Sequence, residues 1–195
     1  YNADAFEQNI GNWQVSDTAT LTDMFSSADL MLSNLGFSST PTSAEFNRTI
    51  FIDRNSLDTA ISAWIADDTA ATATYGDINT WDVRAISDFS ELFKNKTTFN
   101  SDISNWDVSN GNDFGGMFSG ATSFNQDINS WNVGSGTDFG GMFYEADAFN
   151  QDISSWNVSS GTDFSNMFSG ADAFNQDISS WNVSSGTDFG GMFYE

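Results

Sequence analysis

Apolar residues return to the same places along this chain every 25 residues. The sets that keep this period are Trp81, Trp106, Trp131, Trp156 and Trp181; Ile78, Ile103, Ile128, Ile153 and Ile178; Phe99, Phe124, Phe149 and Phe174; and Phe93, Phe118, Phe143, Phe168 and Phe193. The segment FNQDISSWNVSSGTDF at 149–164 recurs unchanged at 174–189. A fixed period of this length predicts a solenoid, in which each coil buries its apolar face against the next.

Within one coil, the spacing predicts a short strand followed by a short helix. Ile153, Trp156 and Val158 have the spacing I-x-x-W-x-V, which matches the L-x-x-L-x-L strand core of leucine-rich repeats. The run 163–170 then places apolar residues at i, i+3 and i+4, between a Thr or Asp cap and a glycine, as a helix of one or two turns does. The predicted fold class is therefore α/β: a leucine-rich-repeat-like solenoid with one short parallel strand and one short helix per 25-residue coil, and a helical insert.

The period is interrupted once, which predicts three regions. Residues 1–27 contain a coil in register and are predicted to be the end of a first repeat array. Residues 28–75 do not fit the pattern and are predicted to be an irregular spacer. Residues 76–195 are predicted to be a second array of about five coils. Because the chain opens at Tyr1 rather than Met, we expect a mature product or a part of a longer chain.

The spacer contains one segment with a helical pattern. At about 55–67, Leu57 and Ile61 lie on one helical face, and Asn55 or Ser56 is the predicted cap. Stacks of repeats need covers because a bare end coil exposes its core and its backbone edge. We therefore predict an amphipathic helix that caps the open end of the second array.

Charge and composition narrow the possible partners. The chain of 195 residues has 5 basic and 27 acidic side chains, a formal charge of −22, and no basic residue after Lys96. Such a surface repels nucleic acid and anionic lipid, and no apolar run approaches the ~20 residues of a membrane span, so we expect no nucleic acid and no membrane insertion. A hydrophobic content of 39% argues against disorder. The absence of Cys and His excludes disulfides, thiol nucleophiles, imidazole bases and the usual zinc sites.

Two columns of aspartates recur with the period. The first, called the N-Q-D column, is Asp102, Asp127, Asp152 and Asp177. Neighbouring strands would place these carboxylates ~4.8 Å apart, so they are candidates to bind calcium, the one cofactor that the sequence suggests. The alternative is that each carboxylate accepts N–H bonds within its own turn.

The second aspartate column precedes the predicted helices, where acidic caps are favoured by the helix dipole. Its members are Asp88, Asp113, Asp138, Asp163 and Asp188. A glycosidase needs an acid and a base in unlike environments. Every carboxyl here recurs in copied surroundings, so we predict no catalytic residues and no enzyme.

The tryptophans are either a platform for sugars or part of the core. They alternate with Val and occupy the buried position of the leucine-rich pattern, which favours the core. The polar positions between them form an exposed strand face that could bind a glycan, a protein or ice, although ice-binding faces are usually rich in Thr. The residues of this predicted face are Asn132, Asn157, Asn182, Ser159 and Ser184.

Sequons for N-glycosylation occur at Asn47, Asn95, Asn157 and Asn182. The first two lie in irregular stretches and are the predicted acceptors. The last two fall on the predicted strand.

The repeat resembles a known family. The core F-N-Q-D-I-S-x-W-x-V, as at 149–158, and the closing M-F-x-G-A, as at 167–171, are similar to the bacterial surface protein repeat of about 26 residues, a BspA-type leucine-rich-like repeat also found in very repetitive marine algal proteins. The likeness covers residues 3–27 and 76–195, and the segment 54–83 resembles the helical lead-in of the algal members. It implies a secreted or surface-displayed scaffold without catalytic residues. The family more often has V-T-x-M where this chain has Gly161 to Phe164, which suggests a bulkier core.

Together these observations predict a non-enzymatic structural or adhesive component of a cell surface or an extracellular filament. Glu195 occupies the position of Glu145 in the repeat, and the chain opens where the pattern would continue, so we expect head-to-tail stacking with another copy or a neighbouring repeat module. The alternatives are a module that binds a surface glycan or protein through the exposed face, and a scaffold stabilised by calcium.

Overall fold

The computed structural model describes residues 48–195, so the predicted first array lies outside the described residues. The chain divides into two compact units, Tyr1–Ile50 and Phe51–Glu195. The second unit begins inside the predicted spacer, so the spacer's helices belong with the second array.

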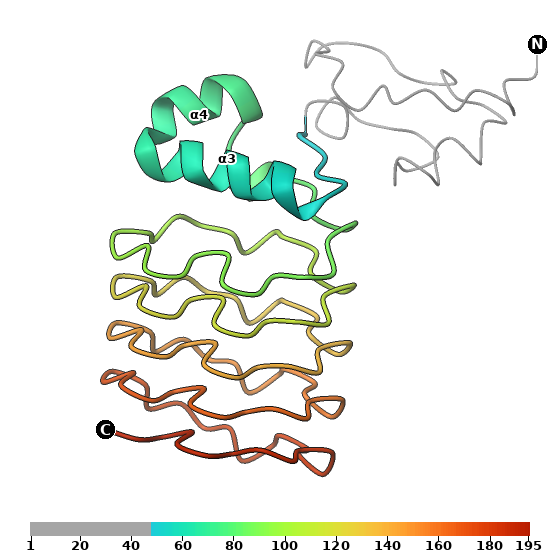
Figure 1. The fold of residues 1–195 in the computed structure, drawn as a ribbon, viewed down its shortest axis with the longest axis vertical. Coiled ribbons are helices and arrows are strands. Elements are labelled where there is room, and N and C mark those ends of the chain that lie inside the picture. Colours follow the sequence, from blue (N-terminus) through green and yellow to red (C-terminus); the bar gives the residue numbers. More distant parts are fainter. Residues whose placement is uncertain (1–47) are drawn as a thin grey trace, which may run out of the picture. The chain divides into compact units, whose positions relative to one another are not determined.

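Two helices cover one end of the repeats (Figure 1). Helix α3 spans Arg54–Ala66 and α4 spans Asp68–Tyr75, and the short 3₁₀ helix η1 follows at Ile78–Thr80. The apolar face of α3 is buried, with Leu57 and Ile61 at its centre. The predicted caps, Asn55 and Ser56, are wrong, because Asp53 is the N-cap and its Oδ1 accepts the Ser56 N–H at 2.9 Å.

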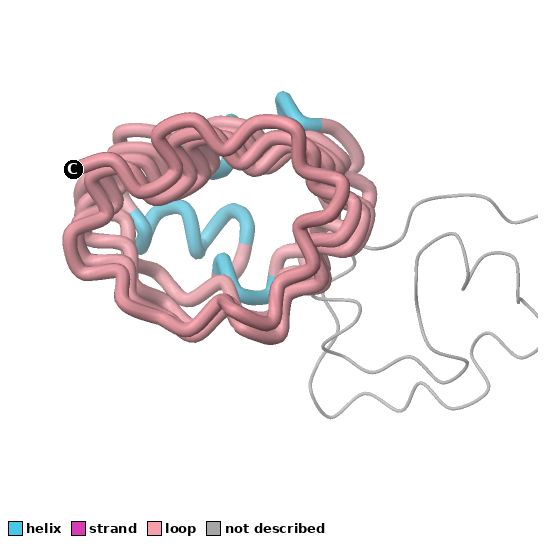
Figure 2. Tube along the Cα trace, turned by 90° about the horizontal axis from the view of Figure 1, so that it is seen from below, coloured by secondary structure: helices cyan, strands magenta, loops and turns pink. Residues whose placement is uncertain are grey.

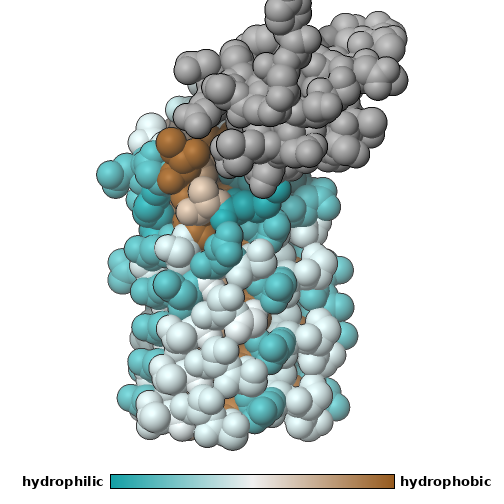
Figure 3. All heavy atoms as spheres, turned by 90° about the vertical axis from the view of Figure 1, so that its right-hand side faces the viewer, coloured by the Kyte–Doolittle hydropathy of each residue, from teal (hydrophilic) through white to brown (hydrophobic). Residues whose placement is uncertain are grey.

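The repeats after η1 lie one above another as coils (Figure 1), and they superimpose on one outline when viewed along the stack (Figure 2). Equivalent phenylalanine rings stack between successive coils. In the column Phe93, Phe118, Phe143, Phe168 and Phe193, ring centroids are 5.3–5.7 Å apart. The face of the stack in Figure 3 is mostly hydrophilic or intermediate, and the apolar columns form the core inside.

The coils lack the strand and the helix that the spacing predicts. Between residues 81 and 195 the structure has turns, irregular backbone and isolated bridges, and parallel bridges pair Asp88, Asp113, Asp138, Asp163 and Asp188 in succession. The I-x-x-W-x-V segment is a turn, in which Trp156 N–H donates to the Ile153 carbonyl at 3.1 Å. The apolar run of the predicted helix also forms turns, in which Met167 N–H donates to the Phe164 carbonyl at 3.3 Å.

A ladder of bonds between coils explains why no helix forms. In the first full coil, alternate N–H groups, those of Phe89, Glu91, Phe93 and Asn95, donate to the carbonyls of Asp113, Gly115, Met117 and Ser119 in the next coil at 2.7–2.9 Å. Of the residues between them, Leu92 and Lys94 donate to the carbonyls three positions back, and Ser90 donates to Asp88 Oδ1. An α-helix needs every N–H for its own i→i−4 bond. Here about half of the N–H groups donate to the next coil instead, so an α-helix cannot form.

The ladder also requires left-handed backbone at set positions. Glu91 and Asn95 have φ of 55° and 58°, and Gly116 and Gly120 take the same places in the next coil with φ of 60° and 68°. Glycine adopts this region without strain, and Asn tolerates it better than most residues. We propose that the stack belongs to the leucine-rich-repeat-like solenoids, with its helices confined to the cap at α3 and α4.

Candidate functional site

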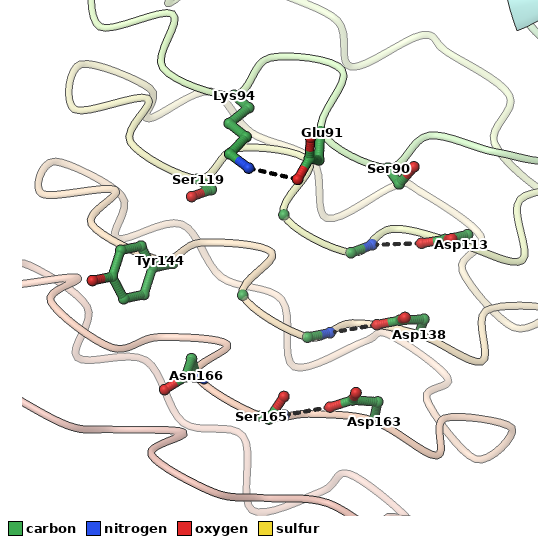
Figure 4. A pocket seen from close by; sticks show the side chains of 14 residues that line it. Ser90, Glu91, Lys94, Asp113, Ser119, Asp138, Tyr144, Asp163, Ser165 and Asn166 are labelled. Carbon is green, nitrogen blue, oxygen red and sulfur yellow. Dashed lines mark hydrogen bonds and ion pairs between the residues drawn. The ribbon is translucent and has the colours of Figure 1, made fainter.

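A groove with a volume of about 490 Å³ runs along one side of the stack. Figure 4 shows its two walls, which carry polar side chains from successive coils. One wall carries Asp113, Asp138 and Asp163, and the other carries Lys94 and Tyr144. Glycines at 115–116 and 140–141 leave the backbone between the walls bare.

The carboxylates of the groove belong to the second aspartate column. Each one caps its own turn, because its Oδ1 accepts the N–H two residues later: Gly115 for Asp113 at 2.9 Å, Gly140 for Asp138 at 2.8 Å and Ser165 for Asp163 at 2.8 Å. Sequence spacing predicted caps at these positions, but caps of helices. The local reason for Asp at every repeat is therefore the turn that precedes the ladder.

The middle carboxylate of the groove is electrostatically strained. Burial raises the pKa of Asp138, the Gly140 N–H lowers it, and the charges of Asp113 and Asp163 raise it further, so the net pKa is raised. The stack thus holds like charges close together in a half-buried place.

Arg54 stands at the head of this column, at the start of α3. Its guanidinium donates to the Asp88 carbonyl at 3.0 Å, to Asp88 Oδ1 at 3.1 Å and to the Ser90 carbonyl at 2.6 Å. A further bond from Nε to Asp58 Oδ1, at 2.8 Å, holds the side chain on the helix. Burial raises the pKa of Asp88, but the hydrogen bonds from Ser90 and the charge of Arg54 lower it more, so the net pKa is lowered.

The aspartates of the N-Q-D column cap their own turns, which is the alternative to calcium binding. Asp102, Asp127, Asp152 and Asp177 each accept the N–H two residues later at 2.9 Å. Hydrogen bonds from Ser154 lower the pKa of Asp152, and those from Ser179 lower the pKa of Asp177. Within residues 48–195, no three acidic residues converge as a group that could hold a metal ion. Calcium stays a prediction, with these carboxylates as its candidate ligands.

The tryptophans of the described repeats are core residues, as predicted. All five, Trp81, Trp106, Trp131, Trp156 and Trp181, are buried. From the second of them on, each indole N–H donates to an isoleucine carbonyl of the preceding coil, as Trp156 does to Ile128 at 3.1 Å. The rings are therefore not available as a platform for sugars.

The predicted strand face is exposed but is built from turns. Asn132, Asn157 and Asn182 each accept, at Oδ1, the N–H two residues later, at 3.1–3.2 Å. Ser159 Oγ also donates to Asn157 Oδ1 at 2.8 Å, and Ser184 is exposed beside Asn182. The structure brings these residues together on one surface of the stack, away from the groove lining.

The two predicted glycosylation sites differ in what the structure shows. Asn47 lies outside the described residues. Asn95 is exposed, but its backbone N–H is bonded to the Ser119 carbonyl and its φ is 58°. Its side-chain oxygen lies directly over Gly120, where a Cβ would meet it at 2.5 Å.

Sequence reasoning missed Arg54 and the groove residues Lys94 and Tyr144. Arg54 contacts residues 34 and 36 positions away, so no local pattern reveals its partners. The one available signal was the scarcity of cations, because a chain with 5 basic residues places few of them without a structural reason. The described helices include none that is long and apolar enough to cross a membrane.

Comparison with known proteins gives one match. A family described as "Mycoplasma protein of unknown function, DUF285" matches residues 1–75, 65–161 and 137–195, which together span the chain. No curated protein and no solved structure matches the chain.

Proposed function

Because the chain belongs to the DUF285 family of repeat proteins, we propose that it is a non-enzymatic structural or adhesive component of a cell surface or an extracellular filament. The observation that carries the proposal is the ladder, in which N–H groups of each described coil donate to carbonyls of the coil that follows it. Any two coils can therefore associate through the same bonds and the same ring columns. A surface that repeats in this way extends by stacking and needs no unique residue.

A contact between two stacks would continue the bonds and the ring columns that join neighbouring coils within one stack. The N–H groups of Phe189, Gly191 and Phe193 donate to no described residue, although their equivalents in the preceding coil do. The Phe193 ring is 60% exposed, whereas Phe143 in the same column is fully buried. A second copy would have to present a coil with free carbonyls, and residues 3–27 carry the repeat motif for such a coil. This is a head-to-tail contact, which does not close and so yields filaments.

Electron microscopy and light scattering over a range of protein concentrations test the proposal. We expect rods that lengthen with concentration, and shorter rods for Phe193→Asp, because a charge would be buried in each contact. Tyr144→Asp adds the same charge on the side of the stack and is the matched control, with unchanged rods. Particles of one short length at all concentrations would overturn the assembly.

A second candidate is a module that binds a glycan or a protein. The groove favours it, because polar side chains from successive coils line it and can form hydrogen bonds to a ligand. Glycan-array binding separates the two surfaces. Loss of binding in Asn157→Ala with Asn182→Ala assigns the turn face, and loss in Asp138→Asn assigns the groove. The absence of any specific glycan hit leaves the scaffold as the sole proposal.

A further inference from the structure

The asparagine and the glutamine of the repeated N-Q-D motif join successive coils through their side chains. Asn125 Oδ1 accepts the Asn150 N–H at 3.0 Å and Gln151 Nε2 at 2.8 Å. Gln151 Nε2 also donates to the Asn125 carbonyl at 3.0 Å. One coil earlier, Asn100 Oδ1 accepts the Asn125 N–H at 2.9 Å and Gln126 Nε2 at 3.0 Å. Each of these glutamines therefore finds its acceptor on the asparagine of the preceding coil.

The coil next to the helical cap departs from this motif. It reads Asn100-Ser101-Asp102, with serine in the place of glutamine. The residue 25 positions before Asn100 is Tyr75, the last residue of α4, so a glutamine at 101 would have no asparagine before it. Ser101 Oγ instead accepts the indole N–H of Trp64, from α3, at 2.9 Å. The serine is thus a contact to the cap and not to another coil.

The length of the side chain at this position matters because the indole is held in place. Trp64 and Ser101 are both partly buried. The Trp64 ring packs edge-on against Trp81, with ring centroids 5.8 Å apart. The short hydroxyl already lies at hydrogen-bond distance from the indole N–H, so the longer side chain of glutamine would have to displace the ring.

Other bonds between the cap and the first coil use groups that every coil supplies. Asn79 of η1 accepts the backbone N–H of Asn105 at 2.9 Å and donates to Asp102 Oδ2 at 2.8 Å. A backbone N–H and the aspartate of the N-Q-D column recur in the following coils, as at Asp127. These bonds do not distinguish the first coil from the others, whereas the bond to Ser101 does.

We propose that the residue between Asn and Asp in this motif specifies which surface its coil packs against. Serine offers an acceptor to the indole N–H and suits the coil that packs on α3. Glutamine offers a donor to an asparagine and suits a coil that packs on another coil. The proposal concerns the order of coils within one chain and does not rest on assembly between chains.

Two deletions of one complete coil, made in the full chain, test the proposal. Deletion of 126–150 leaves Ser101 next to the cap, and each remaining glutamine of the motif still follows a coil with an asparagine. Deletion of 101–125 joins Asn100 to Gln126 and so places a glutamine opposite Trp64. Both variants lose one repeat and one interface between coils, so they are matched in what repetition alone contributes to stability.

The 101–125 deletion should have the lower urea midpoint. We expect its folding equilibrium constant to be about tenfold smaller than that of the 126–150 deletion, because the Trp64 N–H loses its acceptor and Gln126 loses its partner. Gln126→Ser in the 101–125 deletion should restore the midpoint. Gln151→Ser in the same deletion is the control, because residue 151 still follows a coil with an asparagine, and it should lower the midpoint further.

Exchange of the Trp64 indole proton with solvent, followed by NMR and assigned with Trp64→Phe, reports the bond apart from global stability. Exchange should be slower in the 126–150 deletion than in the 101–125 deletion, and Gln126→Ser should slow it again. Ser101→Ala in the complete chain should also speed it, which tests the proposal even if a deletion does not fold. Equal midpoints of the two deletions, no rescue by Gln126→Ser, or unchanged exchange in Ser101→Ala would overturn the proposal.

Discussion

Replacing Arg54 tests whether the stack depends on its capped end. In Arg54→Met the apolar stem remains, but the bonds to the Asp88 and Ser90 carbonyls and to the carboxylates of Asp58 and Asp88 are lost. The two carbonyls belong to the ladder and have no preceding coil to pair with. The change therefore removes the partner that stands in for a missing coil.

The size of the effect follows from the number and the exposure of these bonds. A hydrogen bond to a charged group contributes ~1.5–3 kcal/mol, and the freed carbonyls lie near the surface and can take up water. The Arg54 side chain is 24% exposed, so solvent screens part of the interaction. We expect a loss of about 2–3 kcal/mol in the free energy of unfolding. For a unit of this size that lowers Tm by about 5–10 °C.

Urea unfolding followed by tryptophan fluorescence measures the change, since the five tryptophans of the described repeats are buried. Lys94→Met is the control, because it removes the same charge from an exposed pair with Glu91. That pair should contribute no more than ~1 kcal/mol. Arg54→Lys should restore only part of the loss, because an ammonium cannot reach two carbonyls as a planar fork does. Equal losses in Arg54→Met and Lys94→Met would refute the reasoning.

Three further changes probe the packing, the charges and the metal. Gly136→Ala should cost about 1–3 kcal/mol in urea unfolding, because its Cβ would lie 2.5 Å from Cζ of Phe139. Gly134→Ala is the control, because its Cβ would lie 3.2 Å from Asn132 Oδ1, the end of an exposed side chain, and the equivalent position carries a serine in the next coil; it should change stability by less than ~0.5 kcal/mol, and equal effects would disprove the packing argument. Asp138→Asn keeps the acceptor for its turn and should raise the urea midpoint at pH 7. The wild-type pKa is raised above its usual 3.8, so ionisation costs stability above that pKa. The gain should vanish as the pH falls through the raised pKa towards 3.8, and a gain that persists at lower pH would contradict it. Millimolar calcium should raise Tm if the N-Q-D column binds it, and an unchanged Tm would remove that hypothesis.

The columns of the core could be predicted from the sequence because burial depends on side-chain type at each repeated position. Trp156 and Phe168, for example, are buried where the period places them. The local conformation could not be predicted in the same way. Apolar residues at i, i+3 and i+4 fit a helix, but they fit a series of i→i−3 turns equally well. The deciding bonds run to residues 24 positions away, where no local pattern reports them.

The candidate sites, too, could be predicted only in part from the sequence. Aspartates at each repeat were recognisable as turn or cap residues, because an Asx side chain bonds its own backbone within a few positions. The groove was not recognisable, since its walls come from different coils. The sequons at 157 and 182 were placed on a strand because Trp and Val alternate there. That alternation shows which side chains face the core. The backbone places them there through turns and not through a strand.

The direction of the ladder has a consequence for assembly. All of its N–H groups point to the following coil and all of its carbonyls to the preceding one, so the peptide dipoles on this side of the stack add in one direction. At the carbonyl end of the ladder, Arg54 and the buried face of α3 complete the structure. A cation is favoured there, because aligned peptide dipoles place partial negative charge on the carbonyls. The face that α3 covers is therefore closed to a second stack.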